Sequence, residues 1–160
     1  LEKPWFVNTV DVKSAKEMYE AVTGHAAEQD IIIKAAAVAD YRPKTVSSEK
    51  MKKKDGELTL ELERTDDILA HLGQNKRTGQ FLCGFAMETE DLIENARQKL
   101  KKKHVDMIVA NSLRVEGAGF GGDTNVVTMI TEDEEISLGK MSKEETASQI
   151  IDKILAARAL

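Results

Sequence analysis

The stretch from Ile31 to Lys54, IIIKAAAVADYRPKTVSSEKMKKK, decides the fold class. It opens with an apolar, β-branched run that continues through alanines to Ala39 without polar alternation, which predicts a strand covered on both faces, as in a parallel sheet. The run stops at Asp40, and a basic cluster follows: Lys50, Lys52, Lys53 and Lys54. Open α/β sheets bind ligands at the carboxyl ends of their strands. We therefore expect a site here in which Asp40 accepts hydrogen bonds and the lysines neutralise an anion; the alternative is a turn carboxylate before a solvated basic loop.

Composition limits the function classes. A chain of 160 residues corresponds to one domain, and a net charge of −5 argues against nucleic-acid binding. Local basic clusters on an acidic protein suit a small anion better than a polymer. The single cysteine, Cys83, cannot form an intramolecular disulfide and is expected to be a buried hydrophobe. No apolar run has membrane-spanning length and no signal-peptide pattern opens the chain, so we expect a soluble cytoplasmic domain with no membrane partner.

The segment before Ile31 predicts a strand and a helix. Trp5 to Val10 has the composition of a short strand. Ser14 followed by Glu17 forms a capping box that opens a helix, and Gly24 stands where a C-terminal cap belongs. Together with the Ile31 strand, this pattern predicts one right-handed βαβ unit.

The segment after the lysines continues the alternation of strands and helices. The expected elements are a half-buried strand from Glu57 to Glu63, a short helix capped by Thr65, a buried strand over 80–86, a longer helix opened by Thr89 and a strand over 105–110. The glycine-rich stretch that follows does not match a dinucleotide or P-loop fingerprint.

The C-terminal part predicts a hairpin and a helix. The hairpin joins Val126–Ile130 to Glu135–Leu138, and Ser142 with Glu145 forms a second capping box. The last helix is expected to bury an apolar stripe of Ala147, Ile150, Ile151, Ile154 and Leu155. The whole pattern predicts an α/β fold, a Rossmann-like three-layer αβα arrangement with a mainly parallel sheet.

Two further features bear on chemistry. Lys99 and Lys103 are four residues apart and share a helix face, which could bind an anion or could simply be favourable charge at a helix C-terminus. The histidines lack metal-ligand spacing, so no certain metal ligand is assigned.

Several motifs carry a family resemblance. AAAVADYR, then EKMKK, GFAMET, ARQKLKKK, and AN followed by GFGGDTN occur in this order, and the chain resembles phosphopantothenoylcysteine synthetase, the bacterial, CTP-using ligase of coenzyme A biosynthesis. The resemblance implies Mg²⁺, CTP, 4′-phosphopantothenate and cysteine as reactants, and a homodimer for which the Val126–Leu138 hairpin is a candidate interface. It implies an acyl-cytidylate, formed from CTP with release of pyrophosphate, that cysteine converts to an amide with release of CMP.

The resemblance also implies roles for individual residues. Lys50 would be the catalytic lysine, and Lys52, Lys53 and Asn111 would be additional contacts. The nucleotide-binding residues would be Lys34, Ala35, Ala36, Asp40, Asp66, Asp67, Ile68, Leu69, Phe85, Lys99 and Lys103.

The sequence departs from the family at its start. Family members begin with an extra strand and a loop like N-x-S-S-G-K-M-G, and this sequence begins after that region. The expectation is a single synthetase domain, residues 1–160, that binds CTP while amide formation is impaired. Two alternatives stay open: a non-catalytic nucleotide-binding or dimerisation module, and a nicotinamide- or flavin-binding domain, against which the missing glycine fingerprint argues.

Overall fold

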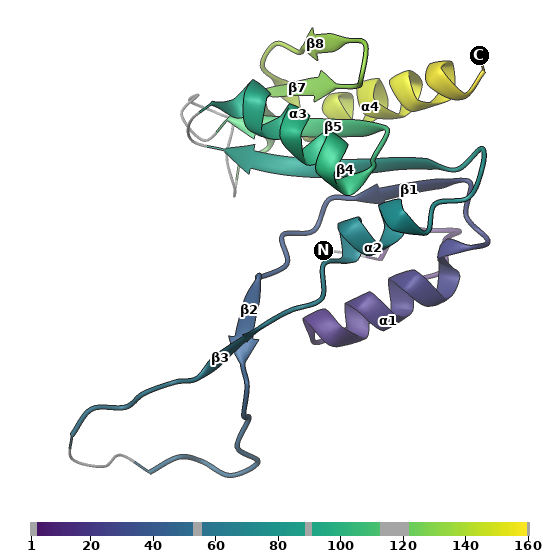
Figure 1. Ribbon diagram of the computed structural model, residues 1–160. Helices are drawn as coiled ribbons and strands as arrows, with labels where there is room; N and C mark the ends of the chain where they lie inside the picture. Colours follow the sequence, from purple (N-terminus) through teal and green to yellow (C-terminus); the bar gives the residue numbers. More distant parts are fainter. Residues whose placement is uncertain (1–2, 53–55, 89–90, 113–121, 160) are drawn as a thin grey trace.

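The computed structural model describes residues 3–52, 56–88, 91–112 and 122–159. Its centre is a five-stranded sheet in the order β1-β4-β5-β7-β8. The strands are β1 (Ile31–Lys34), β4 (Phe81–Glu88), β5 (Met107–Ser112), β7 (Val127–Ile130) and β8 (Glu135–Ser137). The first three strands run parallel. Strand β7 is antiparallel to β5 and β8 is antiparallel to β7, which gives the predicted hairpin (Figure 1).

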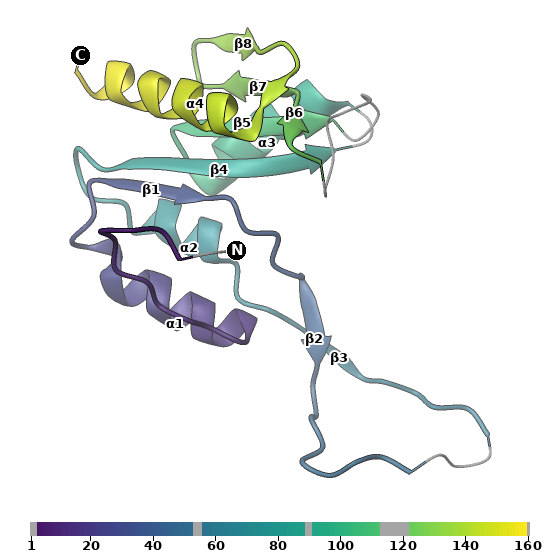
Figure 2. The same cartoon turned by 180° about the vertical axis from the view of Figure 1, so that it is seen from behind.

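Helices cover both faces of this sheet, so the predicted three-layer αβα fold is confirmed. On one face lie α1 (Ala15–Ala26), α2 (Ile68–Gln74) and α3 (Leu92–Lys103). On the other face lies α4 (Lys143–Arg158), which begins at the predicted capping box (Figure 2). A short antiparallel pair, β6 (Thr124–Asn125) and β9 (Met141–Ser142), connects the hairpin region to α4.

Strand β4 separates two hydrophobic clusters because its side chains alternate between the faces. Leu82 and Ala86 pack against α2 and α3, whereas Phe81 and Cys83 pack toward α4. Gly84 allows the close approach of α2, since a Cβ there would lie 2.7 Å from Cδ2 of Leu69. Cys83 is fully buried as predicted, and its burial, with the nearby charge of Asp106, raises the pKa of the thiol to about 12.

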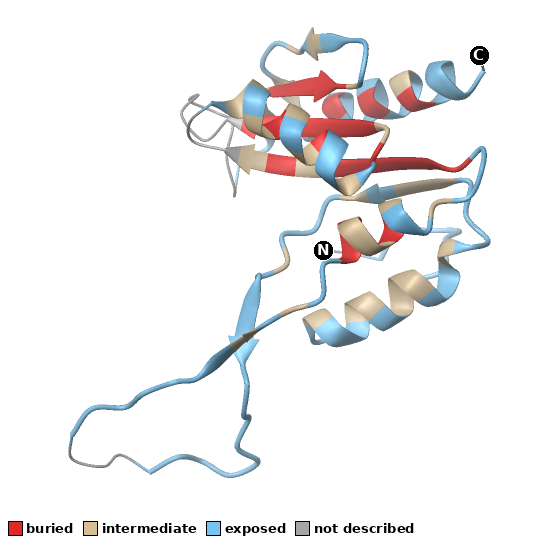
Figure 3. Ribbon diagram, viewed as in Figure 1, coloured by how far each residue is buried: buried red, intermediate tan, exposed pale blue. Residues whose placement is uncertain are grey.

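Residues 41–52 and 56–64 belong to an arm that leaves the sheet between β1 and α2 (Figure 1). Its base is an antiparallel pair of β2 (Tyr41–Pro43) and β3 (Leu62–Arg64). The prediction of a half-buried strand from Glu57 to Glu63 is wrong. Strand β3 is short, and Leu58 and Leu60 are 73% and 59% exposed (Figure 3). The alternating leucines have no surface to pack against, because the arm extends away from both clusters.

The N-terminal prediction is also wrong in part. Trp5 to Val10 forms no strand, and Trp5 is 83% exposed, so the described residues contain no βαβ unit before β1. Helix α1 begins after Ser14 as predicted, but it continues past Gly24 to Ala26. Strand β1 ends at Lys34 and is half-buried at the edge of the described sheet, not covered on both faces.

Two further predictions need correction. Thr65 does not cap α2; its hydroxyl donates to the Ala39 carbonyl at 2.6 Å, and Asp67 is the N-cap. Helix α4 buries Ile150 and Ile154, but the rest of the predicted stripe, Ala147, Ile151 and Leu155, is exposed. The helix start predicted at Thr89 lies outside the described residues, and the described part of α3 begins after Asp91. None of the helices described is long and apolar enough to cross a membrane.

Candidate active site

A pocket of about 790 Å³ opens at the carboxyl ends of β1, β4 and β5. This size is typical of small-molecule sites, and the position is where open α/β sheets bind ligands. The alanines Ala35 and Ala36 form part of its wall, and both are exposed to the pocket side. Their small side chains leave the backbone accessible to a ligand.

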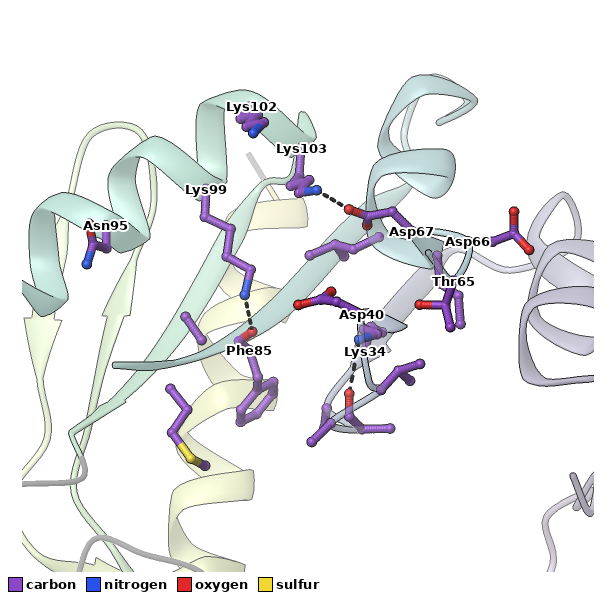
Figure 4. Close-up of a pocket in the computed structure, with 18 of the residues that line it drawn as sticks. Lys34, Asp40, Thr65, Asp66, Asp67, Phe85, Asn95, Lys99, Lys102 and Lys103 are labelled. Carbon is purple, nitrogen blue, oxygen red and sulfur yellow. Dashed lines mark hydrogen bonds and ion pairs between the residues drawn. The ribbon is translucent and has the colours of Figure 1, made fainter. Parts of the chain in front are cut away.

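Three lysines, one from β1 and two from α3, converge on this pocket (Figure 4). The Lys34 ammonium donates to the Ala36 carbonyl at 3.0 Å, and the Lys99 ammonium donates to the Phe85 carbonyl at 3.1 Å. Lys103 forms an ion pair with Asp67. The three ammonium groups are therefore oriented by the protein before any ligand arrives, which lowers the entropic cost of binding an anion.

The pKa of Lys34 is lowered by burial and by its position close to the other two lysines. Burial lowers the pKa of Lys34, the charges of Lys99 and Lys103 lower it further, and Asp67 and Asp40 act in the opposite direction. A ligand with several negative charges would relieve the repulsion among these ammonium groups.

Asp67 has two structural roles. One oxygen accepts from the Ala70 backbone N–H at 2.9 Å and caps α2, and the other pairs with Lys103. Burial alone would raise the pKa of Asp67, but the hydrogen bonds from Lys103 and Ala70 and the charges of Lys103 and Lys34 bring it below its usual value. Asp67 is thus ionised at neutral pH and holds Lys103 at the pocket.

The position of Asp67 depends on a close approach between α2 and the end of α3. A Cβ on Gly73 would lie 1.8 Å from the Lys103 carbonyl oxygen, so only glycine fits there. The contact brings α2 beside α3 and places its N-terminus, with Asp67, at the mouth of the pocket (Figure 4).

The pocket has a second side, on the α4 face of the sheet. Along β4, Phe85 belongs with the cluster that packs against α4, and by alternation Met87 lies on the same face. Met87 is paired in register with Asn111 of β5, which also lines the pocket. Figure 4 shows the Phe85 ring directed away from Lys99. Cations thus lie on the α3 face of β4 and apolar side chains on the other.

The structure brings together every residue expected to bind the nucleotide. Lys34, Ala35, Ala36, Asp40, Asp66, Asp67, Ile68, Leu69, Phe85, Lys99 and Lys103 all line the pocket. Asn111, expected as an additional contact, lines it too. Lys50 and Lys52 are exposed on the arm and are not among the residues that line the pocket, and Lys53 lies outside the described residues.

Other lining residues were not predicted from the sequence. They are Ala37, Val38, Tyr41, Arg64, Thr65, Ala86, Met87, Asn95, Gln98 and Lys102. A helical-face argument finds Asn95 and Lys102, since they precede and follow Lys99 by four and three residues. Tyr41 and Arg64 are contributed by the base of the arm, where the guanidinium of Arg64 lies 5.8 Å from the ring centre of Tyr41. No sequence signal indicates that contact.

Carboxylates are few at this site. Asp40 and Asp66 line the pocket alongside Asp67. Within 3–52, 56–88, 91–112 and 122–159, no three His, Cys, Asp or Glu side chains are grouped so as to hold a metal ion. This donor set fits Mg²⁺ only in the form it commonly takes with nucleotides, held by one or two carboxylates and by the ligand's own phosphates.

Comparisons with known proteins agree with the fold. The family described as the DNA/pantothenate metabolism flavoprotein C-terminal domain matches residues 1–157. The coenzyme A biosynthesis bifunctional protein CoaBC of Bacillus subtilis (strain 168) is 50% identical over 148 residues, which are 92% of this chain and 36% of that protein. A protein named cysteine/cysteine sulfinic acid decarboxylase, from an unknown prokaryotic organism, is 49% identical over 150 residues, 93% of this chain and 42% of that protein.

A solved structure is similar over nearly the whole chain. It is the crystal structure of the C-terminal domain of CoaBC, with 46% identity and a TM-score of 0.79, covering 98% of this chain and 71% of that one. The chain spans well under half the length of the two curated relatives. These matches confirm the resemblance to the phosphopantothenoylcysteine synthetase domain, and the chain belongs to the family of the DNA/pantothenate metabolism flavoprotein C-terminal domain.

Proposed function

We propose that this chain is the ligase domain that joins 4′-phosphopantothenate to L-cysteine in coenzyme A biosynthesis, with CTP as the activating nucleotide. The observation that carries the proposal is the convergence of Lys34, Lys99 and Lys103 in one pocket whose lining includes every residue assigned to the nucleotide by the family resemblance. Three ammonium groups held in place suit a triphosphate better than a ligand of single charge.

The proposed reaction has two steps. In the first, a carboxylate oxygen of 4′-phosphopantothenate attacks the α-phosphorus of CTP, the bond to the β-phosphate breaks, and pyrophosphate leaves. In the second, the cysteine amine attacks the acyl carbon, the bond to CMP breaks, and the amine loses a proton. Positioning and charge neutralisation supply most of the catalysis in such reactions. Lys99 and Lys103 would orient the phosphates, and Asp40 would contact the base or the ribose.

Lys50 is proposed as the residue that stabilises charge as the acyl-cytidylate forms. It is exposed on the arm, so the arm has to bring it to the pocket, from the same chain or from the second subunit of a homodimer. Mg²⁺ bound with CTP would supply further neutralisation of the phosphates, and Asp40 and Asp66 are the pocket carboxylates that would hold it. The relatives' role in a metabolic pathway supports a cytoplasmic location.

The test is a calorimetric titration of the chain with CTP and with ATP in the presence of Mg²⁺, followed by a pyrophosphate-release assay with 4′-phosphopantothenate. We expect selective CTP binding and pyrophosphate release. FMN and NADPH serve as control ligands, and selective binding of either would contradict the proposal.

A second candidate function is a nucleotide-binding module without catalysis. One observation favours it: the residues proposed to bind the nucleotide lie together in one pocket, whereas the lysine proposed for catalysis lies outside it. CTP binding without pyrophosphate release would support this second function.

A further inference from the structure

The side-chain oxygen of Asn111, Oδ1, is buried without a hydrogen-bond partner. It is the only such side-chain atom in the part of the chain that the structure describes. The other buried polar side chains there are satisfied: the Gln80 amide donates to the Ala26 and Gln29 carbonyls at 2.7 Å, and Thr146 donates to the Ser142 carbonyl at 2.8 Å. Asn111 is the exception, and it lines the pocket.

An unpaired buried amide oxygen is costly. Leaving such a group without a partner destabilises a protein, and native structures contain few of them. Asn111 is only 8% exposed, so bulk solvent offsets little of that cost. Because this unpaired oxygen lies at a pocket, a ligand that donates a hydrogen bond to it would explain why it has no partner in the free protein.

The location of Asn111 limits which part of a ligand it meets. In β5 it follows Met107 and Val109 on the α4 face of the sheet, and its register partners are Met87 and Val127. Lys99 and Lys103 belong to α3, on the opposite face. Among the described residues, the Asn111 side of the pocket is therefore apolar, with Phe85 and Met87 as neighbours. A carbonyl oxygen there would repel phosphate oxygens.

We propose that Asn111 Oδ1 accepts a hydrogen bond from an N–H or O–H group on the chain of the acyl substrate and helps to select that substrate. This inference rests on the proposed function. The phosphates of the nucleotide belong with the lysines, which leaves the apolar side to the carboxylic acid. A pantothenate chain combines methyl and methylene groups with amide and hydroxyl donors, which matches apolar walls containing one acceptor.

The experiment compares wild type with Asn111→Leu, a substitution of similar shape that removes the acceptor. Two quantities are measured by calorimetry: the affinity for a CTP analogue with a methylene group between the α- and β-phosphorus atoms, and the affinity of the analogue-saturated protein for 4′-phosphopantothenate. We expect the affinity for the acid to fall about tenfold and the affinity for the analogue to stay within about twofold. The unfolding midpoint without ligand should be equal or higher, since an unsatisfied oxygen has been removed.

Thr128→Val provides a matched control. Thr128 is also buried on a neighbouring strand, but its hydroxyl is paired with Ser137 at 3.2 Å and it does not line the pocket. Loss of the Thr128 hydroxyl should lower the unfolding midpoint and leave the affinities for the CTP analogue and for 4′-phosphopantothenate unchanged. This is the reverse of the pattern expected for Asn111→Leu.

Three results would overturn the inference: an unchanged affinity for the acid, a loss confined to the CTP analogue, or a lower unfolding midpoint for Asn111→Leu. A wild-type chain that binds the analogue but not the acid would also overturn it, while leaving nucleotide binding intact. A wild-type chain that does not bind the analogue would instead contradict the proposed function itself.

Discussion

The lysines of the pocket and the lysines of the arm have the same chemistry but opposite surroundings. Lys34, Lys99 and Lys103 each contact a carbonyl or carboxylate and are oriented toward one space. Lys50 and Lys52 are exposed on an arm that extends from the sheet. The local sequence marks the arm lysines, and Lys99 with Lys103, as basic groups. Packing decides which of them forms a preorganised anion site and adds Lys34 to it.

The largest expected difference between the two regions is in stability. Leu82→Ala, in the sheet, should cost about 2–5 kcal/mol of unfolding free energy, because Leu82 is 1% exposed and its loss leaves a cavity. Leu58→Ala, in the arm, should change that free energy by less than about 0.5 kcal/mol. Urea unfolding followed by circular dichroism measures both. A comparable loss at Leu58 would mean that the arm is packed in solution, and a dependence on protein concentration would assign that packing to a second copy.

The second prediction separates binding from chemistry. In a form of the protein that releases pyrophosphate, Lys50→Gln should lower the rate of release by about 10²–10³-fold, the usual effect of removing one group that stabilises developing charge. Its affinity for CTP should remain near that of wild type, because Lys50 does not line the pocket. The rate is measured with a coupled pyrophosphate assay and the affinity by calorimetry. Near-normal release by a folded variant would exclude Lys50 from catalysis.

Substitutions of the pocket lysines should give the opposite pattern. Lys99→Ala should weaken CTP binding by about 10- to 100-fold, as expected for a lost charged hydrogen bond. Lys101→Ala is the matched control, since Lys101 lies on the same helix and is exposed outside the pocket. Equal losses for the two variants would show that the overall charge of the helix, not the pocket, governs binding.

The smallest expected effect concerns the ion pair between Asp67 and Lys103. Asn also caps helices well, so Asp67→Asn removes the charge and keeps the cap. Because the pKa of Asp67 is lowered in the folded state, its ionised form adds stability above the ordinary pKa of 3.8, and this stability is lost as pH falls through the lowered value. The side chain is half exposed, so the contribution should be below about 1 kcal/mol.

The measurement is a double-mutant cycle of Asp67→Asn with Lys103→Gln, followed by thermal unfolding between pH 2 and pH 7. The coupling between the two residues should be constant from pH 7 to about pH 5 and should vanish at the acid end. A coupling that persists in acid would show that the two side chains interact by packing and not by charge.

Much of the fold follows from local patterns in the sequence. The capping box at Ser142, the buried run containing Cys83 and the C-terminal hairpin all appear where the residues predict them. Ser14 is the N-cap of α1 as predicted, but its box is incomplete, because the Glu17 carboxylate accepts from the Lys13 N–H and the Ser14 hydroxyl. These features depend on contacts between residues a few positions apart. The family resemblance added the other residues expected to bind the nucleotide, and all of them line the pocket. The residues by themselves pointed only to Asp40, Lys99 and Lys103.

Other features were decided only by the tertiary structure. The sequence could not show that Trp5 to Val10 lacks a neighbouring strand, that the arm leucines have no surface to cover, or that only one side of α4 is buried. Nor could it show that Asp67 pairs with Lys103, 36 residues away, or that the side-chain oxygen of Asn111 has no hydrogen-bond partner. The physical reason is range: caps and strand alternation are set by neighbouring residues, whereas burial, ion pairing and the unsatisfied oxygen depend on which distant segments pack together.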